Sequence, residues 1–496
     1  MEESEYEKQR RKNILANQAL LAELALTSPA GPLLSSSAGG AKSNRAKSSS
    51  SPGAPAKRAP RPKPKKEPTE HVPRRTSSRL AGIPADSELA KKKRKAEDDE
   101  AVRVEREKEK KKQRIDERMK FVVPDLGWEG AKIVVRDEEE ELKLEDEEDV
   151  KEEGSEDGEE KGINRIRARL GRLKLWEEFP VADLKITQER IYHMEFHPSR
   201  DKPLIFAGDK IGNLGILDAS PSAAIKKDDD NDEEDTDTST PSITNIKLHT
   251  RTLPSFTFSP TTPSTLLSAS YDGSIRSLDL NTGESTQLYA LEDTGEGLSS
   301  LSVLPDNTIV FSSLSGLVGH VDPRAPANTR TWECSEKKIG HISAHPAAGR
   351  ILATASLDRT VKLWDLRHMS SPIAEHESRL SVSSANISQN GEVVTTSYDD
   401  TIKIYDPELK VKTVVRHSNQ TGRWVTIFKA KWWRTERVVI ASMNRWIDVY
   451  NREGELLGQV GRDEEQITAV PAAVAAHAGR EWVVGGTGSG KVTLFM

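Results

Sequence analysis

A repeated segment in the C-terminal two thirds of the chain constrains the fold more than any other feature of the sequence. Each copy has a small residue, a turn, and then alternating residues that end at an aspartate or asparagine. These end points are Asp218, Asp279, Asp322, Asp365, Asp406 and Asn451. After a first gap of 61 residues, they are spaced by 43, 43, 41 and 45 residues. A degenerate seventh copy covers residues 486–495, so the chain repeats one structural unit.

A second set of repeated segments supports the same periodicity. An apolar strand, a turn and another apolar strand precede the copies, as at Phe196-His197-Pro198 and Ala344-His345-Pro346. Four short strands per unit at this period predict an all-β fold, a seven-bladed WD-repeat β-propeller over residues 176–496. We expect residues 181–186 to supply the outer strand of the last blade, which closes the ring. The long first gap holds an acidic insert at about 226–242, which we expect to form an exposed loop.

The first 175 residues differ in composition from the rest. Only 35% of the chain is hydrophobic, against roughly 45–50% in a globular domain. Tyr6, Phe121 and Trp128 are the only aromatic residues in this first part. Such a segment buries too little apolar surface to offset the entropy of ordering it. We therefore expect residues 27–175 to form a long disordered tail. Residues 1–26 are expected to form a short amphipathic helix, which either binds a partner or stays transient.

Charge in this tail changes sign along the chain. Residues 41–120 carry 26 Lys and Arg against 13 Asp and Glu, whereas residues 137–160 carry 16 acidic residues against Lys143 and Lys151. The basic segment would add sequence-independent affinity for phosphate backbones. The acidic segment is either simply solvated or a site for histones. A nuclear localisation signal is predicted at the densest basic cluster, Lys91, Lys92, Lys93, Arg94 and Lys95.

Cysteine content and hydropathy limit the compartment. A single cysteine, Cys334, excludes an intramolecular disulfide and a multi-cysteine zinc site. No apolar run reaches the ~18 residues needed to span a membrane, and the N-terminus does not resemble a secretory signal. We expect a monomeric protein of the nucleus, with the cytoplasm as a second location, that has no metal or other cofactor.

Two motifs that suggest an enzyme have simpler explanations. His341, Ser356 and Asp358 have the residue types of a catalytic triad, but in a WD blade these types, with Trp364, form a structural hydrogen-bond network. The segment 485–491 matches G-x-x-x-x-G-K. A P-loop, however, needs Ser or Thr next and then a helix, whereas Val492 and a strand follow here. We therefore expect a protein without catalytic residues.

Basic residues recur on one predicted face of the propeller. The turns before the third strands and the connections that enter the blades open on the same face. These segments carry Arg190, Lys210, Arg251, Lys337, Lys338, Arg359, Arg379, Arg423 and Arg445. A ring of this kind attracts polyanions although the net charge of the chain is −6. Ordinary exposed Lys and Arg would give the same pattern. Trp432 and Trp433 could stack on or wedge between bases, although most Trp in propellers belong to the core.

A different motif is expected on the opposite face. Trp364-Asp365-Leu366-Arg367 ends one repeat, and Asp322-Pro323-Arg324 ends the one before, with Val321 in place of Trp. The motif W-D-x-R at consecutive blades resembles the one by which WD-repeat proteins dock to the damaged-DNA-binding adaptor of cullin-4 ubiquitin ligases. The resemblance implies a docking site at Asp322, Arg324, Trp364, Asp365 and Arg367. An arginine that only pairs with its own blade aspartate is the alternative.

Longer strings are more specific than the generic repeat residues. They are IYHMEFHP at 191–198, FAGDKIGNLG at 206–215, NQTGRW at 419–424, KWWR at 431–434 and MNRW at 443–446. With the segments 6–26 and 74–81, they resemble the fungal DNA damage-binding WD-repeat proteins and their animal WD-repeat relatives. The resemblance implies a nuclear protein that binds DNA, prefers damaged duplex, and acts in DNA metabolism and the damage response.

Two functions follow as hypotheses. The first is a non-enzymatic protein that binds double-stranded DNA, preferably with UV-type damage, through the basic rim. The second is a protein-interaction scaffold, either a substrate receptor of a cullin-4 type ubiquitin ligase or a reader of histones or chromatin. One protein could have both functions, because the two proposed surfaces lie on opposite faces.

Overall fold

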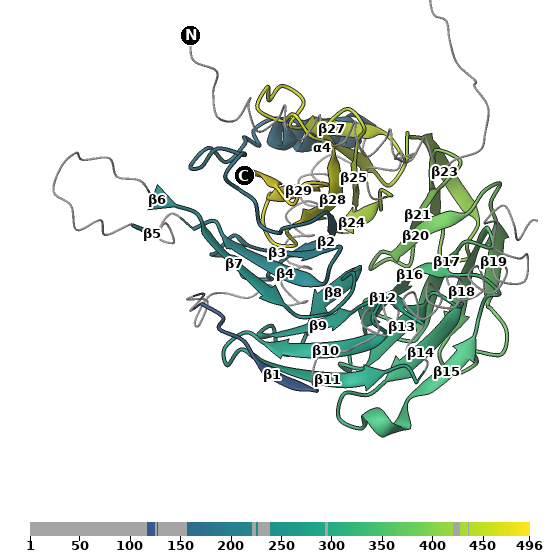
Figure 1. Ribbon diagram of the computed structural model, residues 1–496. Helices are drawn as coiled ribbons and strands as arrows, with labels where there is room; N and C mark the ends of the chain where they lie inside the picture. Colours follow the sequence, from purple (N-terminus) through teal and green to yellow (C-terminus); the bar gives the residue numbers. More distant parts are fainter. Residues whose placement is uncertain are drawn as a thin grey trace, which may run out of the picture. The chain divides into compact units, whose positions relative to one another are not determined.

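The sequence repeats fold as antiparallel sheets, the blades of a seven-bladed β-propeller, and this confirms the predicted fold (Figure 1). The computed structural model describes residues 117–124, 126, 156–220, 225–226, 239–292, 296–419, 427–434 and 436–496. These residues belong to one compact unit, Pro84–Met496. The amphipathic helix predicted at 1–26 and the localisation signal predicted at 91–95 lie outside the described residues.

The strands of each blade follow one another in sequence from the central channel outward. Blade 1 consists of β2 (Ile191–Phe196), β3 (Leu204–Asp209), β4 (Asn213–Asp218) and β7 (Ser242–Lys247). Blade 2 consists of β8 (Ser255–Phe258), β9 (Thr265–Ala269), β10 (Ser274–Asp279) and β11 (Glu284–Ala290). Blade 3 consists of β12 (Leu298–Val303), β13 (Ile309–Ser313), β14 (Leu317–Val321) and β15 (Arg330–Glu333), with the 3₁₀ helix η2 (Pro326–Asn328) before β15.

The remaining blades repeat this order. Blade 4 consists of β16 (Ile339–Ala344), β17 (Ile351–Ser356), β18 (Thr360–Asp365) and β19 (Ala374–Glu377). Blade 5 consists of β20 (Val382–Ile387), β21 (Val393–Ser397), β22 (Thr401–Tyr405) and β23 (Val411–Arg416). Blade 6 consists of β24 (Lys431–Trp433), β25 (Arg437–Ala441), β26 (Ile447–Asn451) and β27 (Leu456–Val460). Blade 7 consists of β28 (Pro471–Ala476), β29 (Val483–Thr487) and β30 (Val492–Phe495).

Burial decreases from the inner strands of a blade to its outer strand. Every residue of β3 and of β29 is buried, because neighbouring blades cover both faces of these strands. The outer strand β23 instead alternates between exposed and half-buried residues. The apolar runs of the sequence therefore mark the second strands, and the alternating segments mark the outer half of each blade.

Residues N-terminal to blade 1 complete blade 7 and close the ring. The Trp176 N–H donates to the Leu494 carbonyl at 2.8 Å, and the Val492 N–H donates to the Leu184 carbonyl at 3.0 Å. The prediction of an outer strand at 181–186 is therefore right for its C-terminal part. The structure differs in using a second short segment, near Trp176, against the other end of β30. β2 also contacts β28, so the first and last blades pack together.

Two ordered elements lie in the segment that was predicted to be a disordered tail, so that prediction is wrong for them. Helix α4 (Glu156–Leu170) packs on β27, and strand β1 (Arg118–Lys120) pairs with β11 as a fifth strand of blade 2. Leu170 is buried in the core shared with blade 6, and Ile163 and Ile166 pack against that core. These side chains recur at helical spacing, a signal that the high overall charge of the segment masks.

The acidic insert lies between β4 and β7, as expected. The short strands β5 (Ile225–Lys226) and β6 (Ser239–Thr240) pair with each other. β4 then pairs with β7, so the insert interrupts the sequence of blade 1 but leaves the blade four-stranded. Most of the insert, residues 227–238, lies outside the described residues.

Candidate nucleic-acid interface

One face of the propeller collects the predicted basic residues. Because neighbouring strands of a blade are antiparallel, the connection entering the first strand and the turn between the second and third strands lie at the same end. We name this end the basic face. Of the predicted residues it carries Arg190, Lys210, Arg251, Lys337, Lys338, Arg359, Arg379 and Arg445. Arg423, also predicted here, lies outside the described residues.

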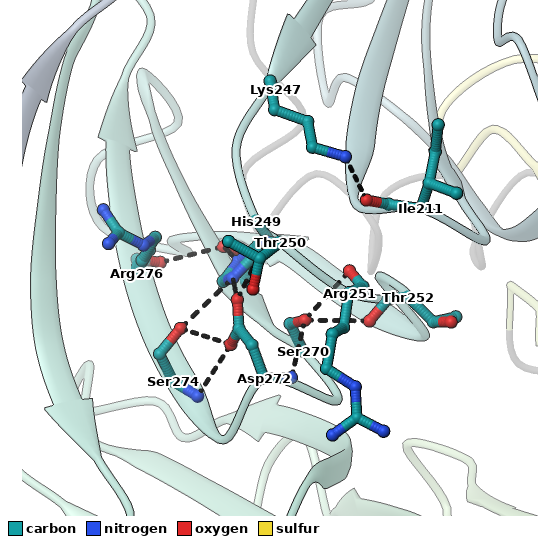
Figure 2. Close-up of polar contacts among 11 residues, drawn as sticks. Ile211, Lys247, His249, Thr250, Arg251, Thr252, Ser270, Asp272, Ser274 and Arg276 are labelled. Atoms are coloured by element: carbon teal, nitrogen blue, oxygen red, sulfur yellow. Dashed lines mark hydrogen bonds and ion pairs between the residues drawn. The ribbon is translucent and has the colours of Figure 1, made fainter. Parts of the chain in front are cut away.

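Hydrogen bonds hold three of these residues together at blades 1 and 2. The Lys210 N–H donates to the Arg190 carbonyl at 2.9 Å, and the Thr252 hydroxyl donates to the Lys210 carbonyl at 2.7 Å. The Ser270 hydroxyl donates to the Arg251 carbonyl at 3.1 Å, while the guanidinium of Arg251 points away from these contacts (Figure 2). The backbone of this cationic cluster is therefore fixed by hydrogen bonds between its segments.

One residue in each turn between the second and third strands has a left-handed backbone. Glycine occupies this position at Gly212, Gly273, Gly316 and Gly490, whereas Arg359, Asp400 and Arg445 occupy it in the other three turns, with φ of 80°, 58° and 79°. Lys210 precedes Gly212 by two residues. Lys210 therefore lies on the basic face but does not occupy the turn position of Arg359 and Arg445.

Two arginines keep this strained position. A side chain in the left-handed region costs roughly 1–2 kcal/mol that glycine avoids. Arg359 is 54% exposed and its Nη2 lies 3.4 Å from Oε1 of Glu377, which is 68% exposed. Exposed pairs of this kind contribute only about 0–1 kcal/mol, so a phosphate can replace the carboxylate. Arg445 is also exposed. Strain retained at two exposed cations favours a functional role over a structural one.

A buried polar network supports the turn of blade 2 (Figure 2). The Asp272 carboxylate lies 3.0 Å from His249 Nδ1 and accepts the Ser274 hydroxyl at 2.6 Å. His249 Nε2 lies 2.9 Å from the Ser268 hydroxyl. Burial would raise the pKa of Asp272, but the charge and hydrogen bond of His249, together with Ser274, outweigh it and hold that pKa well below its ordinary value. The ionised carboxylate thus fixes the turn that presents Tyr271 on the basic face.

The network predicted for blade 4 is different in the structure. The Ser335 hydroxyl contacts the Ser356 hydroxyl and the Asp358 carboxylate, both at 2.8 Å. His341 Nδ1 instead lies 2.8 Å from the Ala385 carbonyl. The prediction that His341 shares a network with Ser356 and Asp358 is therefore wrong. The reason is that His341 lies within strand β16, whereas His249 lies in the connection before its blade. The three residues also lack the contacts of a catalytic triad.

The basic face has a cavity of about 260 Å³ at the mouth of the central channel. Its lining comes from six blades, from their entry segments, first strands and turns between second and third strands, and includes Arg190, Tyr192, Tyr271, Lys338, Tyr398 and Lys429. The Nζ of Lys338 lies 3.1 Å from the Tyr271 hydroxyl and 5.2 Å from the centre of its ring. Burial, with the neighbouring Tyr271, raises the pKa of Tyr192 and of Tyr398, so both phenols stay neutral. We name this the mouth cavity.

Sequence reasoning missed the tyrosines and Lys429 of the mouth cavity. Tyr192, Tyr271 and Tyr398 come from three blades, and only the closed ring brings them together. Tyr271 and Tyr398 each follow a buried serine at the end of a second strand, which was the one local signal available.

The channel below the mouth cavity is closer to neutral. A cavity of about 410 Å³ there is lined by groups that include His193, Glu195 and Lys431. Lys431 Nζ donates to the Met194 carbonyl at 3.0 Å. Burial raises the pKa of Glu195 to about 7 against the opposing effect of Lys431, and burial lowers the pKa of His193. The cationic character is therefore concentrated at the mouth.

The two tryptophans predicted to probe DNA do not lie on the basic face, and that prediction is wrong. Trp433 is 1% exposed, and its Nε1 donates to the His477 carbonyl at 2.9 Å. Trp432 lines the lower channel cavity and donates its Nε1 to the Asn386 carbonyl at 3.0 Å. Both side chains are held by strand β24, whose alternation directs one into the core of blade 6 and the other toward the channel.

The opposite face carries the two predicted Asp-x-Arg segments at the ends of β14 and β18. Arg324 Nε lies 2.9 Å from Asp322 Oδ1, and Arg367 Nη2 lies 2.5 Å from Asp365 Oδ2. The hydrogen bonds from Arg367 lower the pKa of Asp365 to about 2. Both arginines are exposed. Trp364 is 4% exposed, so the prediction that it contacts a partner directly is wrong.

Membrane-spanning helices and metal sites were also sought in the part of the chain that the structure describes. None of its helices has the length and apolar character to cross a membrane. Across the same ranges, no group of three or more His, Cys, Asp or Glu side chains is arranged to hold a metal ion.

Comparison with known proteins adds an independent observation. The family model for the WD domain, G-beta repeat, matches residues 328–365 and 370–406, in blades 3 to 5. The DNA damage-binding protein CMR1 of Phaeosphaeria nodorum is 43% identical over 542 residues, which cover 100% of this chain and 99% of the relative. Proteins of the same name from Emericella nidulans and Neurospora crassa are 41% and 38% identical, and each alignment covers 99% of this chain and at least 98% of the relative.

Proposed function

Because the chain belongs to the family of fungal DNA damage-binding WD-repeat proteins, we propose that it binds double-stranded DNA across the basic face. The observation that carries the proposal is the pair of exposed arginines, Arg359 and Arg445, at left-handed turn positions where four of the other five blades use glycine. A backbone phosphate is the ligand that best explains cations kept there at a cost in stability.

The exposed cations of the basic face would contact phosphates along the duplex. Lys210 and Arg251 at blades 1 and 2, and Arg359 and Arg445 at blades 4 and 6, surround the mouth of the channel. Such contacts position DNA without reading its sequence, and each neutralised phosphate makes binding more dependent on salt. The basic segment at 41–120 would add affinity of the same kind. Within this proposal Trp432 and Trp433 have no direct part.

A preference for damaged, UV-type duplex would come from the mouth cavity. Damaged or mismatched bases cost less to unstack than intact ones. The mouth cavity lies at the centre of the cationic ring, so a nucleotide displaced from the stack could enter it while the flanking phosphates contact the rim. Tyr192, Tyr271 and Tyr398 supply aromatic surfaces in that cavity.

The biological setting follows from this activity. A protein that binds damaged DNA acts in the nucleus, and the basic cluster at 91–95 is the proposed import signal. The WD-repeat propeller is typically a non-catalytic scaffold. The protein would therefore act in DNA metabolism and the damage response by binding, and not by turnover.

The direct test is binding of the full-length protein to matched intact and UV-irradiated duplexes over a series of salt concentrations. Tighter binding to the irradiated duplex, and weaker binding of both as salt rises, is expected. Equal affinity for the two duplexes would remove the damage preference while leaving DNA binding in place. No measurable binding to either at low salt would contradict the proposal.

A second function is favoured by the opposite face. Arg324 and Arg367 are exposed, project from the same position of consecutive blades, and are each held in a fixed direction by a preceding aspartate. We propose this pair as a docking site for the damaged-DNA-binding adaptor of cullin-4 ligases, formed by Asp322, Arg324, Asp365 and Arg367. Arg367→Glu should abolish co-purification of that adaptor and leave DNA affinity unchanged. Adaptor retained by the variant would refute the site.

Binding to histones or chromatin rests on the acidic segments at 137–160 and 226–242. These segments lie largely outside the described residues. Histone binding therefore stays a prediction from the sequence.

A further inference from the structure

Lys429 differs from the other cations of the basic face in its surroundings. It lies in the segment before β24, is half-buried, and lines the mouth cavity together with Lys338 and three tyrosines. It also lines the small space beneath, next to Lys431 and His193. Among the described residues no carboxylate pairs with it. The amine therefore faces an open cavity and like charges.

These surroundings favour the neutral amine. Burial, followed by the charges of Lys431 and Lys338, lowers the pKa of Lys429 to about 7. Burial also lowers the pKa of Lys431, but there the carboxylate of Glu195 opposes the effect of burial. A neutral lysine amine in a cavity is a nucleophile for carbonyl carbons, whereas a protonated one is not.

The position of Lys429 indicates which carbonyl compound would reach it. The mouth cavity of about 260 Å³ has several times the ~30 Å³ that one water molecule occupies. It lies inside the ring formed by Arg190, Lys338, Arg359 and Arg445, so a polyanion is drawn to its opening. An aldehyde attached to a phosphodiester backbone satisfies both conditions. Among damaged forms of DNA, an abasic site has this chemistry, because its ring-opened deoxyribose carries a free aldehyde at C1′.

We propose that Lys429 captures the aldehyde of an abasic deoxyribose in the mouth cavity as a Schiff base. This inference rests on the proposed function, since the basic face must hold the DNA. The Nζ of Lys429 attacks C1′ and forms the C–N bond of a carbinolamine. The carbinolamine then loses its hydroxyl group and the remaining amine proton as one molecule of water, which leaves the C=N bond. The step needs no oxidant or reductant and amounts to stoichiometric, reversible capture.

The groups that face Lys429 suit this step. Lys338 and Arg190 supply positive charge for the flanking phosphates. Tyr192, Tyr271 and Tyr398 line the same cavity with hydroxyl groups that can exchange protons with the departing oxygen. Burial, followed by the charges of Lys429 and Lys431, lowers the pKa of His193 and of His341, so both imidazoles stay neutral. The rate of capture should therefore rise with the neutral fraction of Lys429 itself.

The test is reductive trapping with the full-length protein. The protein is incubated with cyanoborohydride and a duplex that carries a single abasic site, and the covalent complex is measured on a denaturing gel. The matched control is a duplex in which a tetrahydrofuran residue replaces the abasic deoxyribose. Tetrahydrofuran has no aldehyde. We expect a complex with the first duplex only, and a reduced adduct that maps to Lys429. Trapping should be half-maximal near pH 7, whereas an ordinary lysine has a pKa of about 10.4.

Variants separate Lys429 from the other lysines. Lys429→Arg keeps the charge and removes the nucleophile, so trapping should fall roughly ten-fold or more while affinity for the tetrahydrofuran duplex is retained. Lys410→Arg, at an exposed lysine of the turn between β22 and β23 on the opposite face, is the control and should trap normally. Trapping that persists in Lys429→Arg, or an adduct that maps to the N-terminal lysines, would overturn the proposal.

A DNA-independent probe makes failure of the two proposals distinguishable. 2-Deoxyribose 5-phosphate with cyanoborohydride should label Lys429 in the intact protein without any duplex. A protein that binds damaged duplex but traps neither probe contradicts the Schiff base and leaves the proposed function standing. A protein that is labelled by the sugar phosphate but binds no duplex supports the nucleophile and contradicts the proposed function.

Discussion

The two faces of the propeller carry arginines in opposite electrostatic settings. On the basic face, Arg359 and Arg445 project from left-handed turns, and the one carboxylate near Arg359 belongs to an exposed and weak pair. On the opposite face, Arg324 and Arg367 are each bound by the aspartate two residues earlier through two or more hydrogen bonds. Two arginines are compared on each face, but the charges of Arg324 and Arg367 are neutralised by their own aspartates.

This difference explains why the net charge of −6 is a poor guide to function. A polyanion responds to cations that lack tight local partners, and their arrangement decides whether it binds. The same arginine chemistry, held by a neighbouring aspartate, instead presents a fixed and directional group to a protein partner. Charge changes made on one face at a time show whether the two faces act separately.

The largest effect is expected from reversing charge on the basic face. The double variant Arg359→Glu/Arg445→Glu removes two charge-assisted contacts and adds repulsion, so duplex affinity should fall at least about 150-fold, from ~1.5–3 kcal/mol per contact. The matched control is Arg324→Glu/Arg367→Glu, which makes the same change in charge on the other face and should alter affinity less than about three-fold. Fluorescence anisotropy at one fixed salt concentration measures both. Equal losses in the two variants would mean that only net charge matters.

Loss of the network under the basic face should be the next largest effect. Asp272→Ala leaves buried His249 and Ser274 without their acceptor, and we expect the free energy of unfolding to fall by about 3 kcal/mol. The folded pKa of Asp272 lies below its unfolded value. Its contribution is therefore complete above the unfolded pKa of about 3.9 and is lost as pH falls below it. Denaturant unfolding at pH 7 and at pH 3 should show a smaller difference between wild type and variant at pH 3.

Helix α4 tests where the folded part begins. Leu170→Ala removes a side chain that is 4% exposed in the core of blade 6, so unfolding should become easier by roughly 2–3 kcal/mol. A fragment that starts at residue 176 loses the whole helix and should be less stable than one that starts at residue 156. Thermal unfolding of the two fragments measures this. Identical stability would mean that α4 adds nothing to the propeller.

The smallest effect is expected from Arg445→Gly, which separates the backbone strain at this position from the charge of its side chain. Arg445→Gly relieves the left-handed backbone and should raise the free energy of unfolding by about 1 kcal/mol or less, because the flexibility of glycine offsets part of the gain. The same change should weaken duplex binding by roughly ten-fold. Gly273→Arg would be the reverse experiment in blade 2. A variant Arg445→Gly that is no more stable would contradict the interpretation that this position stores strain.

The sequence predicted the repeats well because strand alternation and turn residues are local signals. It placed the third strand of every blade and the insert before β7. It failed where contacts are non-local: β1 is three mostly polar residues that pair with β11, and the mouth cavity joins side chains from six blades. Trp432 and Trp433 show a further limit, because their neighbours Lys431 and Arg434 suggest a nucleic-acid surface while the pleat of β24 directs both rings inward.

The salt dependence of duplex binding shows whether the basic face contacts phosphates. For the full-length protein, Arg359→Ala/Arg445→Ala should reduce the slope of log K against log salt by about 2, since each lost phosphate contact reduces it by ~0.9. Arg324→Ala/Arg367→Ala should leave the slope of the wild type unchanged. If the slope is the same in all three proteins, Arg359 and Arg445 do not contact phosphates, and the proposed DNA interface is wrong.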